Sequence, residues 1–424
     1  MTLRTEARPH QRALLVALER SGEYWQESLA ELTRLAETAR VEVVGTVLQK
    51  RDAPDPVYFL GKGKAHEIRQ IKGELGADVL LVDGDLRPTQ QRNLEEAANI
   101  GVLDRTGLIL DIFAQRARSG EGKIQVELAQ LSYLLPRLTG KGTELSRLGG
   151  GIGTRGPGET KLEADRRRLR QRLRLLRKQV EQIAKRRSVE RKHRQEAGLP
   201  VVALVGYTNA GKSTLLNTLS GAGVFVEDLL FATLDPTIRR LDLPGGERAL
   251  LVDTVGFIHR LPHQLVEAFK STLEEVRRAE LLLHVVDATN PEAEQQIAIV
   301  ERVLDEIGAG ATPTILAWNK IDRAGGMPPR EISDHPPIVG VASISAATGA
   351  GIGELLATIE GWLDRERVRI EVTIPPRRGD LLAWLHRSAK VVSERYEDGA
   401  AVVTALVTPK MAGQLRKRLT ETVC

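Results

Sequence analysis

VVALVGYTNAGKST, from Val201 to Thr214, is the stretch that decides the fold of the central part of this 424-residue chain. Five apolar residues predict a buried strand, and the pattern GxxxxGKS follows directly, from Gly206 to Ser213. The glycines of such a motif let backbone N–H groups surround phosphate oxygens, the lysine (Lys212) reaches the β- and γ-phosphates, and the serine hydroxyl ligates Mg²⁺. Because the motif stands between a strand and a helix, the sequence predicts a phosphate-binding P-loop in an α/β domain.

A second motif follows at DTVG. Asp253 ends the apolar run ALLVD, and Gly256 comes three residues later. An acidic residue at this position holds Mg²⁺ through water, and the glycine N–H senses the γ-phosphate. We therefore expect Ser213 and Asp253 to contribute to a magnesium site, and Lys212 and Gly256 to act on the phosphates.

A third motif, Asn319-Lys-Ile-Asp322, ends the apolar run TPTILAW. A carboxylate at its last position accepts hydrogen bonds from guanine N1–H and from the N2 amine, which adenine lacks, so the motif selects GTP over ATP. Ser345-Ala346 fits the loop whose backbone closes over guanine O6. The three motifs predict these nucleotide-binding residues: Gly206, Tyr207, Thr208, Asn209, Ala210, Gly211, Lys212, Ser213, Thr214, Asp253, Thr254, Val255, Gly256, Asn319, Lys320, Asp322, Ser345 and Ala346.

Two positions in these motifs bear on the rate of hydrolysis. Phe257 follows DTVG, where many GTPases have a glutamine that orients the attacking water. Phenylalanine cannot hydrogen-bond that water, so we expect slow intrinsic hydrolysis that a partner accelerates. Asn209 resembles the asparagine of potassium-activated GTPases, in which K⁺ replaces an arginine finger. The alternative is that Asn209 only hydrogen-bonds within its loop.

Upstream of the P-loop, residues 11–118 alternate short apolar runs with helical patterns, which is typical of a small parallel α/β sheet. The predicted strands are 13–18, 41–49, 78–83 and 101–110, and the predicted helices are 25–39, 64–75 and 89–98. The run Gly61-Lys-Gly-Lys64 could touch phosphate, but it lacks the spacing of a nucleotide motif. A loop that enters a helix explains it more simply.

Two helices with apolar seams follow, which predicts an antiparallel hairpin, although the seams could instead dock on neighbouring domains. The first seam consists of Ile124, Leu128, Leu131, Leu135 and Leu138, and the second of Leu162, Leu169, Leu173, Leu176, Val180 and Ile183. A capping box at 160–163 predicts the start of the second helix. The connecting segment 139–158 contains eight glycines with Lys141, Arg147 and Arg155, which suits either close approach to phosphate or a flexible linker.

Charge is concentrated in one segment. Residues 155–197 contain 16 Lys and Arg against 6 Asp and Glu, whereas the rest of the chain contains 45 basic and 50 acidic residues. Such a segment is the footprint of a polyanion contact or, alternatively, a solvated charged helix. The only cysteine is Cys424, and the N-terminus lacks a signal-peptide pattern, so we expect a cytoplasmic protein without a membrane span. We infer no obligate homo-oligomer from the sequence.

These patterns divide the chain into four predicted domains of an α/β protein. An N-terminal parallel α/β domain spans 1–118, a helical hairpin spans 119–198, a P-loop GTPase domain spans 199–365, and a small C-terminal α/β domain spans 366–424. The last part reads as a strand at 368–374, a helix at 380–389, two strands around Asp398-Gly399 and a final helix.

The sequence resembles the HflX family within the Obg–HflX group of translational GTPases. The resemblance rests on GYTNAGKSTLLN, LFATLDPT (230–237), DTVGFI (253–258), NKID and GGGIGTRGPGETKLE, and it covers nearly the whole chain. It implies that Thr233 is the switch threonine that closes on Mg²⁺ and the γ-phosphate. It adds to the expected nucleotide-binding residues Phe231, Ala232, Thr233, Leu234 and Asp235.

The resemblance also implies a partner, the large ribosomal subunit and its rRNA. Family members split stalled or idle ribosomes, particularly under stress, and the glycine-rich segment would reach toward the peptidyl-transferase centre. One alternative is a ribosome-assembly GTPase that acts on immature large subunits. Another is a constitutive RNA-binding protein whose nucleotide is structural, in which case Lys212→Ala would lower stability but leave RNA affinity unchanged. The expected ligands are GTP, Mg²⁺ and, through Asn209, K⁺.

Overall fold

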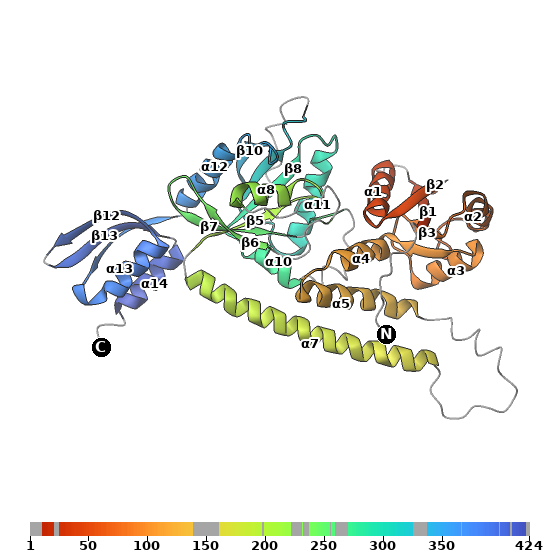
Figure 1. Cartoon of the computed structure of the whole chain (residues 1–424), viewed down its shortest axis with the longest axis horizontal. Helices are drawn as coiled ribbons and strands as arrows, with labels where there is room; N and C mark the ends of the chain where they lie inside the picture. Colours follow the sequence, from red (N-terminus) through yellow and green to blue (C-terminus); the bar gives the residue numbers. More distant parts are fainter. Residues whose placement is uncertain are drawn as a thin grey trace. The chain divides into compact units, whose positions relative to one another are not determined.

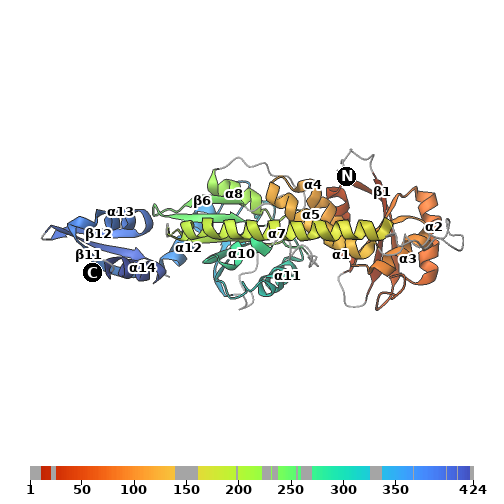
Figure 2. The same ribbon diagram turned by 90° about the horizontal axis from the view of Figure 1, so that it is seen from below.

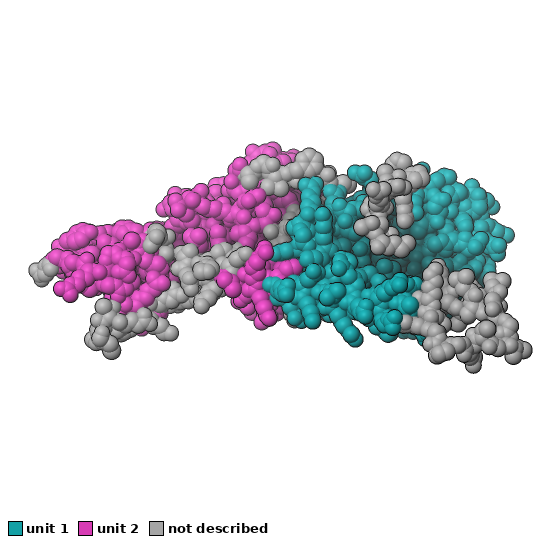
Figure 3. Space-filling model, turned by 60° about the horizontal axis from the view of Figure 1, so that its bottom comes forward, with its two compact units in different colours: residues 1–182, 228–235, 259–270 teal, residues 183–227, 236–258, 271–424 magenta. Residues whose placement is uncertain are grey.

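The computed structural model describes residues 11–20, 25–138, 161–196, 199–221, 231, 237–254, 256–258, 270–324, 337–365, 367–397, 399–407 and 409–420. The chain forms two compact units (Figure 3). The first comprises residues 1–182, 228–235 and 259–270, and the second comprises residues 183–227, 236–258 and 271–424. Each unit has an apolar core of its own.

The first unit is built on a four-stranded sheet in the order β2-β1-β3-β4, and all its neighbouring strands are parallel. Its strands are β1 (Gln11–Glu19), β2 (Val41–Lys50), β3 (Val79–Val82) and β4 (Gly101–Asp104). The helices between them are α1 (Trp25–Thr38), α2 (Lys62–Leu75) and α3 (Pro88–Ala98). The predicted parallel α/β sheet is therefore confirmed (Figure 1).

The predicted strand 101–110 is wrong in its second half. The strand β4 ends at Asp104, and the helix α4 (Arg105–Arg116) begins immediately after it. The Asp104 carboxylate accepts from the backbone N–H of Gly107 at 2.8 Å and so caps the first turn of α4. The capping side chain of Asp104 lies within the apolar run and ends the strand there, whereas the prediction treated the whole run as one strand.

The predicted hairpin is confirmed, and α7 contributes its residues up to 182 to the first unit. Helix α5 (Gly120–Arg137) lies alongside helix α7 (Lys161–Glu196), and the two run in opposite directions (Figures 1 and 2). Leu128, Leu173 and Leu176 form the buried centre of this contact, and Arg172 makes two hydrogen bonds to Glu127 at its side. The predicted capping residue 160 and the segment 139–158 lie outside the described residues.

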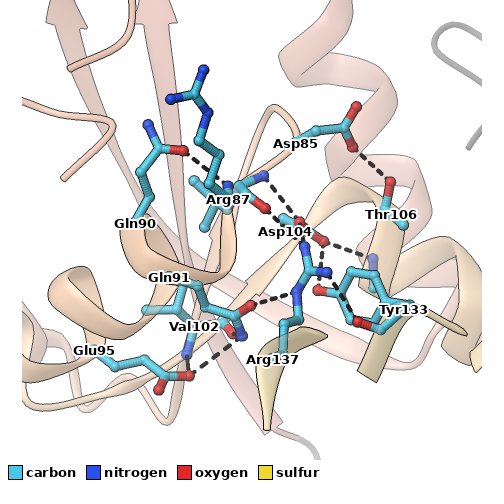
Figure 4. A network of polar contacts seen from close by, with 12 residues as sticks. Asp85, Arg87, Gln90, Gln91, Glu95, Val102, Asp104, Thr106, Tyr133 and Arg137 are labelled. Atoms are coloured by element: carbon cyan, nitrogen blue, oxygen red, sulfur yellow. Dashed lines mark hydrogen bonds and ion pairs between the residues drawn. The ribbon is translucent and has the colours of Figure 1, made fainter. Parts of the chain in front are cut away.

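The end of α5 is fixed to the sheet by a buried polar network around Asp104 (Figure 4). The Asp104 carboxylate accepts from the Tyr133 hydroxyl at 2.8 Å, from the Arg137 guanidinium at 2.9 Å and from the Leu86 N–H at 3.0 Å. Burial raises the pKa of Asp104, and these donors act against that rise. The network fixes the last turn of α5, directly before residue 139.

The second unit contains a six-stranded sheet in the order β10-β9-β8-β5-β7-β6, which is parallel except for β6. Its strands are β5 (Val201–Val205), β6 (Thr237–Asp242), β7 (Arg248–Asp253), β8 (Leu281–Asp287), β9 (Thr314–Asn319) and β10 (Ile338–Ser343). The helices are α8 (Lys212–Ser220), α10 (Lys270–Arg277), α11 (Ala293–Glu306) and α12 (Ile352–Arg365). The strands β5 and β9 are almost completely buried, as parallel strands covered by helices on both faces must be.

A smaller sheet in the order β11-β13-β12 closes the second unit. It consists of β11 (Val368–Ile374), β12 (Lys390–Glu397) and β13 (Ala400–Val407), and it packs against α13 (Gly379–Ser388) and α14 (Pro409–Thr420), with a short 3₁₀ turn η1 (Pro376–Arg378) before α13. All five elements predicted for the tail, three strands and two helices, are present. Among the described residues, no helix has the length and apolar content needed to cross a membrane.

Candidate nucleotide-binding site

The P-loop lies where β5 ends and α8 begins, at the carboxyl edge of the parallel sheet. Two of its glycines are required by close contacts, one with the backbone of β8 and one with the Asn319 side chain. A Cβ on Gly206, which has φ +143°, would lie 2.3 Å from the Val285 carbonyl oxygen of β8. A Cβ on Gly211, which has φ +97°, would lie 2.2 Å from the amide nitrogen of Asn319. The loop is thus held against β8 and β9 in a conformation that side chains at these positions would prevent.

The Lys212 ammonium is hydrogen-bonded inside the P-loop. Its Nζ donates to the carbonyl oxygens of Gly206 at 2.9 Å and Tyr207 at 2.7 Å, and the residue is 6% exposed. Burial lowers the pKa of Lys212 to about 8, and the negative charge of Asp253 opposes this shift. A bound phosphate would supply the negative charge that restores the ammonium form.

Ser213 and Asp253 lie together beside this lysine. The Ser213 hydroxyl donates to Asp253 Oδ2 at 3.2 Å, and Asp253 is 1% exposed at the end of β7. A hydroxyl and a carboxylate at this distance are hard oxygen donors, and such donors suit Mg²⁺ with water and phosphate oxygens as further ligands. The two predicted metal ligands that the structure describes therefore fit the ion.

Phe257 joins the DTVG motif to the P-loop through its backbone. Its carbonyl oxygen accepts from the Thr208 N–H at 2.8 Å, and its own N–H donates to the Gly206 carbonyl at 3.1 Å. These bonds form a short parallel bridge between Tyr207 and Phe257. The Phe257 ring is buried, with 1% exposure, so it is a core residue and has no polar group to offer to water.

Asn319, the first residue of the motif Asn319-Lys-Ile-Asp322, is 2% exposed and stabilises the guanine end of the site. Its amide nitrogen donates to the Ala210 carbonyl at 2.8 Å, and its amide oxygen accepts from the Ala346 N–H at 2.9 Å. One side chain therefore connects the P-loop, the end of β9 and the loop after β10. These three segments are far apart in the sequence, and the structure brings them together through Asn319.

The rest of the motif is arranged around Asn319. Lys320 has φ +65°, and its ammonium donates to Asp287 Oδ2 at 2.7 Å. The side chain of Asp322 is 26% exposed, with Arg323 Nε at 3.7 Å. Ser345 is fully buried, and its hydroxyl accepts from the Thr348 N–H at 3.2 Å, which shapes the loop that carries Ala346.

Several predicted residues have other positions or fall outside the described part. The Thr254 hydroxyl donates to the Leu204 carbonyl at 2.6 Å, so its side chain ties β7 to β5. Phe231 belongs to the first unit, where its ring lies 4.5 Å from that of Phe113. Asn209 is exposed, with φ +62°, and no hydrogen bond of its side chain occurs among the described residues. The positions Ala232, Thr233, Leu234, Asp235 and Val255 lie outside the described residues.

Two residues near the site were not predicted. His284 lies within the apolar strand β8 at 2% exposure, and burial together with the charge of Lys212 lowers its pKa to about 3, so the ring is neutral. The Thr218 hydroxyl of α8 donates to the Ala346 carbonyl at 2.7 Å. In the sequence, His284 is notable only as a polar residue within an apolar run. No sequence feature indicated the role of Thr218.

Comparison with known proteins decides the family. The chain is 49% identical over 410 residues to the GTPase HflX of Caldanaerobacter subterraneus subsp. tengcongensis, which covers 97% of this chain and 94% of that relative. It is 46% identical over 392 residues to the GTPase HflX of Escherichia coli K12, which covers 92% of each. The chain belongs to the HflX GTPase family.

Family models match consecutive parts of this HflX-family chain. They are described as GTP-binding GTPase N-terminal (26–114), GTP-binding GTPase Middle Region (116–194), 50S ribosome-binding GTPase (201–320) and HflX C-terminal domain (338–423). Among solved structures, a GTP-binding protein from Sulfolobus solfataricus in complex with GDP is 26% identical, with a TM-score of 0.42 over 83% of this chain and 98% of that chain. The predicted α/β fold and the prediction of a GTP-hydrolysing P-loop enzyme are confirmed.

Proposed function

We propose that this HflX-family GTPase binds the large ribosomal subunit and couples GTP binding and hydrolysis to the splitting or rescue of ribosomes under stress. The observation that carries the proposal is the match of residues 201–320 to the 50S ribosome-binding GTPase family, together with the motifs described above. A ribosomal partner also favours a cytoplasmic location. We also propose that the chain divides into four domains, with boundaries after residues 118, 198 and 365.

The charge of α7 supports an RNA contact. In the hairpin, Leu173 and Leu176 of α7 are buried against α5, while the cationic side chains between and beyond them are exposed. These exposed cations are Arg167, Arg168, Arg170, Arg172, Arg174, Arg177, Lys178, Lys185 and Arg186. Leu173 and Leu176 lie on the face of α7 that packs on α5, and we propose that exposed cations on the other faces bind phosphates of rRNA.

The anchoring of α5 supports a role for the segment that follows it. Arg137 donates to the Leu86 carbonyl at 2.8 Å and to Gln91 Oε1 at 2.8 Å, in addition to its bond to Asp104. Three acceptors therefore fix the end of α5 to the sheet of the first unit. We propose that the glycine-rich segment 139–158, which follows in the sequence, enters the ribosome.

The switch part of the mechanism is proposed from the P-loop geometry. Lys212 would hold the β- and γ-phosphates, and Ser213 with Asp253 would hold Mg²⁺, which neutralises phosphate charge when bound. Asp322 would accept from guanine. Because the Phe257 ring is buried, no side chain at this position orients the attacking water, so basal turnover is slow and the ribosome supplies or orders the missing group. The proposed K⁺ site at Asn209 is tested by comparing rates in KCl and NaCl.

The experiment is GTP turnover by the purified chain in potassium buffer, alone, with mature large subunits and with immature large-subunit particles. Stimulation by mature subunits, accompanied by separation of 70S particles on sucrose gradients, is the expected result. Preferential stimulation by immature particles would favour the assembly function. If neither particle stimulates turnover, the ribosomal proposal fails, while the assignment as a GTPase is unaffected.

A further inference from the structure

The loop after β10 contains one backbone N–H group that the fold does not use. Six of the seven N–H groups from Ile344 to Ala350 donate to protein acceptors. These bonds run from Ile344 to the Trp318 carbonyl at 2.7 Å, from Ser345 to the Ala350 carbonyl at 2.9 Å, from Ala346 to Asn319 Oδ1 at 2.9 Å, from Thr348 to Ser345 Oγ at 3.2 Å, from Gly349 to the Ser345 carbonyl at 2.8 Å and from Ala350 to Thr348 Oγ1 at 3.4 Å. The exception is the N–H of Ala347, an exposed residue, which has no acceptor among the described residues.

The direction of this N–H is fixed from within the protein. The Ala346 carbonyl belongs to the same peptide plane, and in a trans peptide the C=O and the following N–H point in opposite directions. The Ala346 carbonyl accepts from the Thr218 hydroxyl of α8 at 2.7 Å. The Ala347 N–H therefore points away from α8, and this orientation lasts as long as Thr218 holds the carbonyl.

Thr218 is the only donor to the Ala346 carbonyl among the described residues, and Ala346 is 3% exposed. Threonine hydroxyls in helices commonly donate to the carbonyl four residues earlier. That acceptor, the Thr214 carbonyl, lies 3.1 Å from Thr218 Oγ1, which is longer than the 2.7 Å to Ala346. A hydroxyl has a single proton, so the shorter contact indicates that Thr218 is bonded to the loop and not only to its own helix.

The same peptide lies beside the guanine motif. The sequence predicted that the backbone at Ser345 and Ala346 closes over guanine O6. In the structure, however, the Ser345 N–H donates to Ala350 and the Ala346 N–H donates to the Asn319 side chain. Neither group can donate to O6 without giving up its present bond. The unused N–H of Ala347 can do so without such a loss.

We propose that the Ala347 N–H donates to guanine O6 and that Thr218 is a positioning residue for this contact, which it controls through the Ala346 carbonyl. Thr218 lies outside the nucleotide motifs and does not itself touch the base. Without its hydroxyl, the carbonyl must turn to water to find a donor, and the N–H turns with it. The inference rests on the guanine contact proposed above for Asp322 and does not depend on the ribosomal function.

The test compares three diphosphates on the purified full-length chain by calorimetry. In 6-thio-GDP a sulfur, which is a weak acceptor, replaces O6, while the N1–H and the N2 amine remain. IDP keeps O6 and the N1–H but lacks the N2 amine. Thr218→Val should weaken GDP and IDP about fivefold and 6-thio-GDP by less than about twofold, as expected for loss of one neutral hydrogen bond. Thr218→Ser keeps the hydroxyl and should keep all three affinities near those of the native chain.

Thr358→Val in α12 is the matched control. The Thr358 hydroxyl donates to the Glu354 carbonyl at 2.8 Å, four residues earlier, and has no further acceptor among the described residues, so its loss should change none of the affinities. Equal weakening of GDP and 6-thio-GDP by Thr218→Val would mean that Thr218 only supports the fold. Unchanged GDP affinity would mean that it does not position an O6 donor, and either result overturns the proposal.

Two further measurements complete the test. If Thr218→Val does not fold, Thr218→Ala gives the same comparison, because the ratio of the dissociation constants for GDP and 6-thio-GDP does not depend on the folded fraction. A ratio equal to that of the native chain again contradicts the proposal. Equal affinities of the native chain for GDP and ADP would refute the guanine site itself, and the role of Thr218 with it.

Discussion

The Arg137 guanidinium donates to the Asp104 carboxylate across 2.9 Å, and the two residues are 33 positions apart in the sequence. Asp104 ends β4 and caps α4, whereas Arg137 ends α5, so this ion pair joins the sheet of the first unit to the helical hairpin. Asp104 is 1% exposed and accepts from four donors in total. Its carboxylate is therefore the centre on which the orientation of α5 depends.

Asp104→Asn should destabilise the first unit strongly. The amide can accept through only one of its two atoms, so buried donors, including the Arg137 guanidinium, lose their acceptor, and removal of one partner of a buried pair costs about 3–5 kcal/mol. Thermal unfolding and hydrogen exchange at β4 measure the change. The control is Asp85→Asn, which removes the charge of the exposed acceptor of Thr106 but keeps an amide oxygen there, and it should cost no more than about 1 kcal/mol. Equal effects of the two substitutions would contradict the central role of Asp104.

Nucleotide affinity should fall as the pH rises above about 8. The folded, nucleotide-free protein has a Lys212 pKa of about 8, depressed by burial, so the side chain is largely neutral above that pH. Bound phosphates favour the ammonium form, so binding must take up a proton there, and the Kd for GDP should rise by up to about tenfold per pH unit. Calorimetry at pH 8.5 in two buffers of different ionisation enthalpy counts the protons. Absence of proton uptake would show that Lys212 is already charged in the free protein.

The sequence predicted the parts of this site that depend on local chemistry. The strand before Gly206, the lysine and serine of the P-loop, and Asp253 at the end of β7 all follow from motifs whose spacing is fixed by the phosphates. Sequence could not show that Asn319 connects Ala210 to Ala346, because that contact depends on the three-dimensional order of the strands. It also missed the change from strand to helix at Asp104, where a capping side chain outweighs the β-propensity of the following apolar run.

Asp322→Asn should change the base specificity of the nucleotide site from guanine to xanthine. The native carboxylate accepts from the guanine N1–H and N2 amine, whereas an asparagine amide can donate to the O2 carbonyl that xanthine has in place of that amine. Affinity for GDP should fall about a hundredfold or more, since a hydrogen bond to a charged group is lost and a donor faces a donor. Competition by XDP and GDP for a fluorescent nucleotide measures the exchange. The control Asp305→Asn, on α11, should leave both affinities unchanged.

Removing exposed cations from α7 should weaken ribosome binding in a salt-dependent manner. The triple variant Arg174→Gln, Arg177→Gln, Lys178→Gln leaves the buried leucines of the hairpin in place and removes three potential phosphate contacts. The slope of log K against log salt concentration should become shallower by about 2–3, according to counterion release. Binding to large subunits is measured by filter retention at several KCl concentrations. The single variant Arg302→Gln, on the exposed face of α11, should leave the slope unchanged, and the same slope in the triple variant would exclude α7 as an RNA contact.

Phe257→Gln should not convert this chain into a fast GTPase. The native ring is buried, and the backbone on both sides of it is bonded to Gly206 and Thr208, so a glutamine would inherit an orientation toward the core. Burial of an amide without partners costs about 1–3 kcal/mol, which thermal unfolding should detect. Single-turnover hydrolysis should stay at or below the native rate, whereas Phe257→Leu should retain both stability and rate. A clear rise in basal hydrolysis with Phe257→Gln would show that residue 257 can turn toward the phosphates, and the view of Phe257 as a fixed core residue would then be wrong.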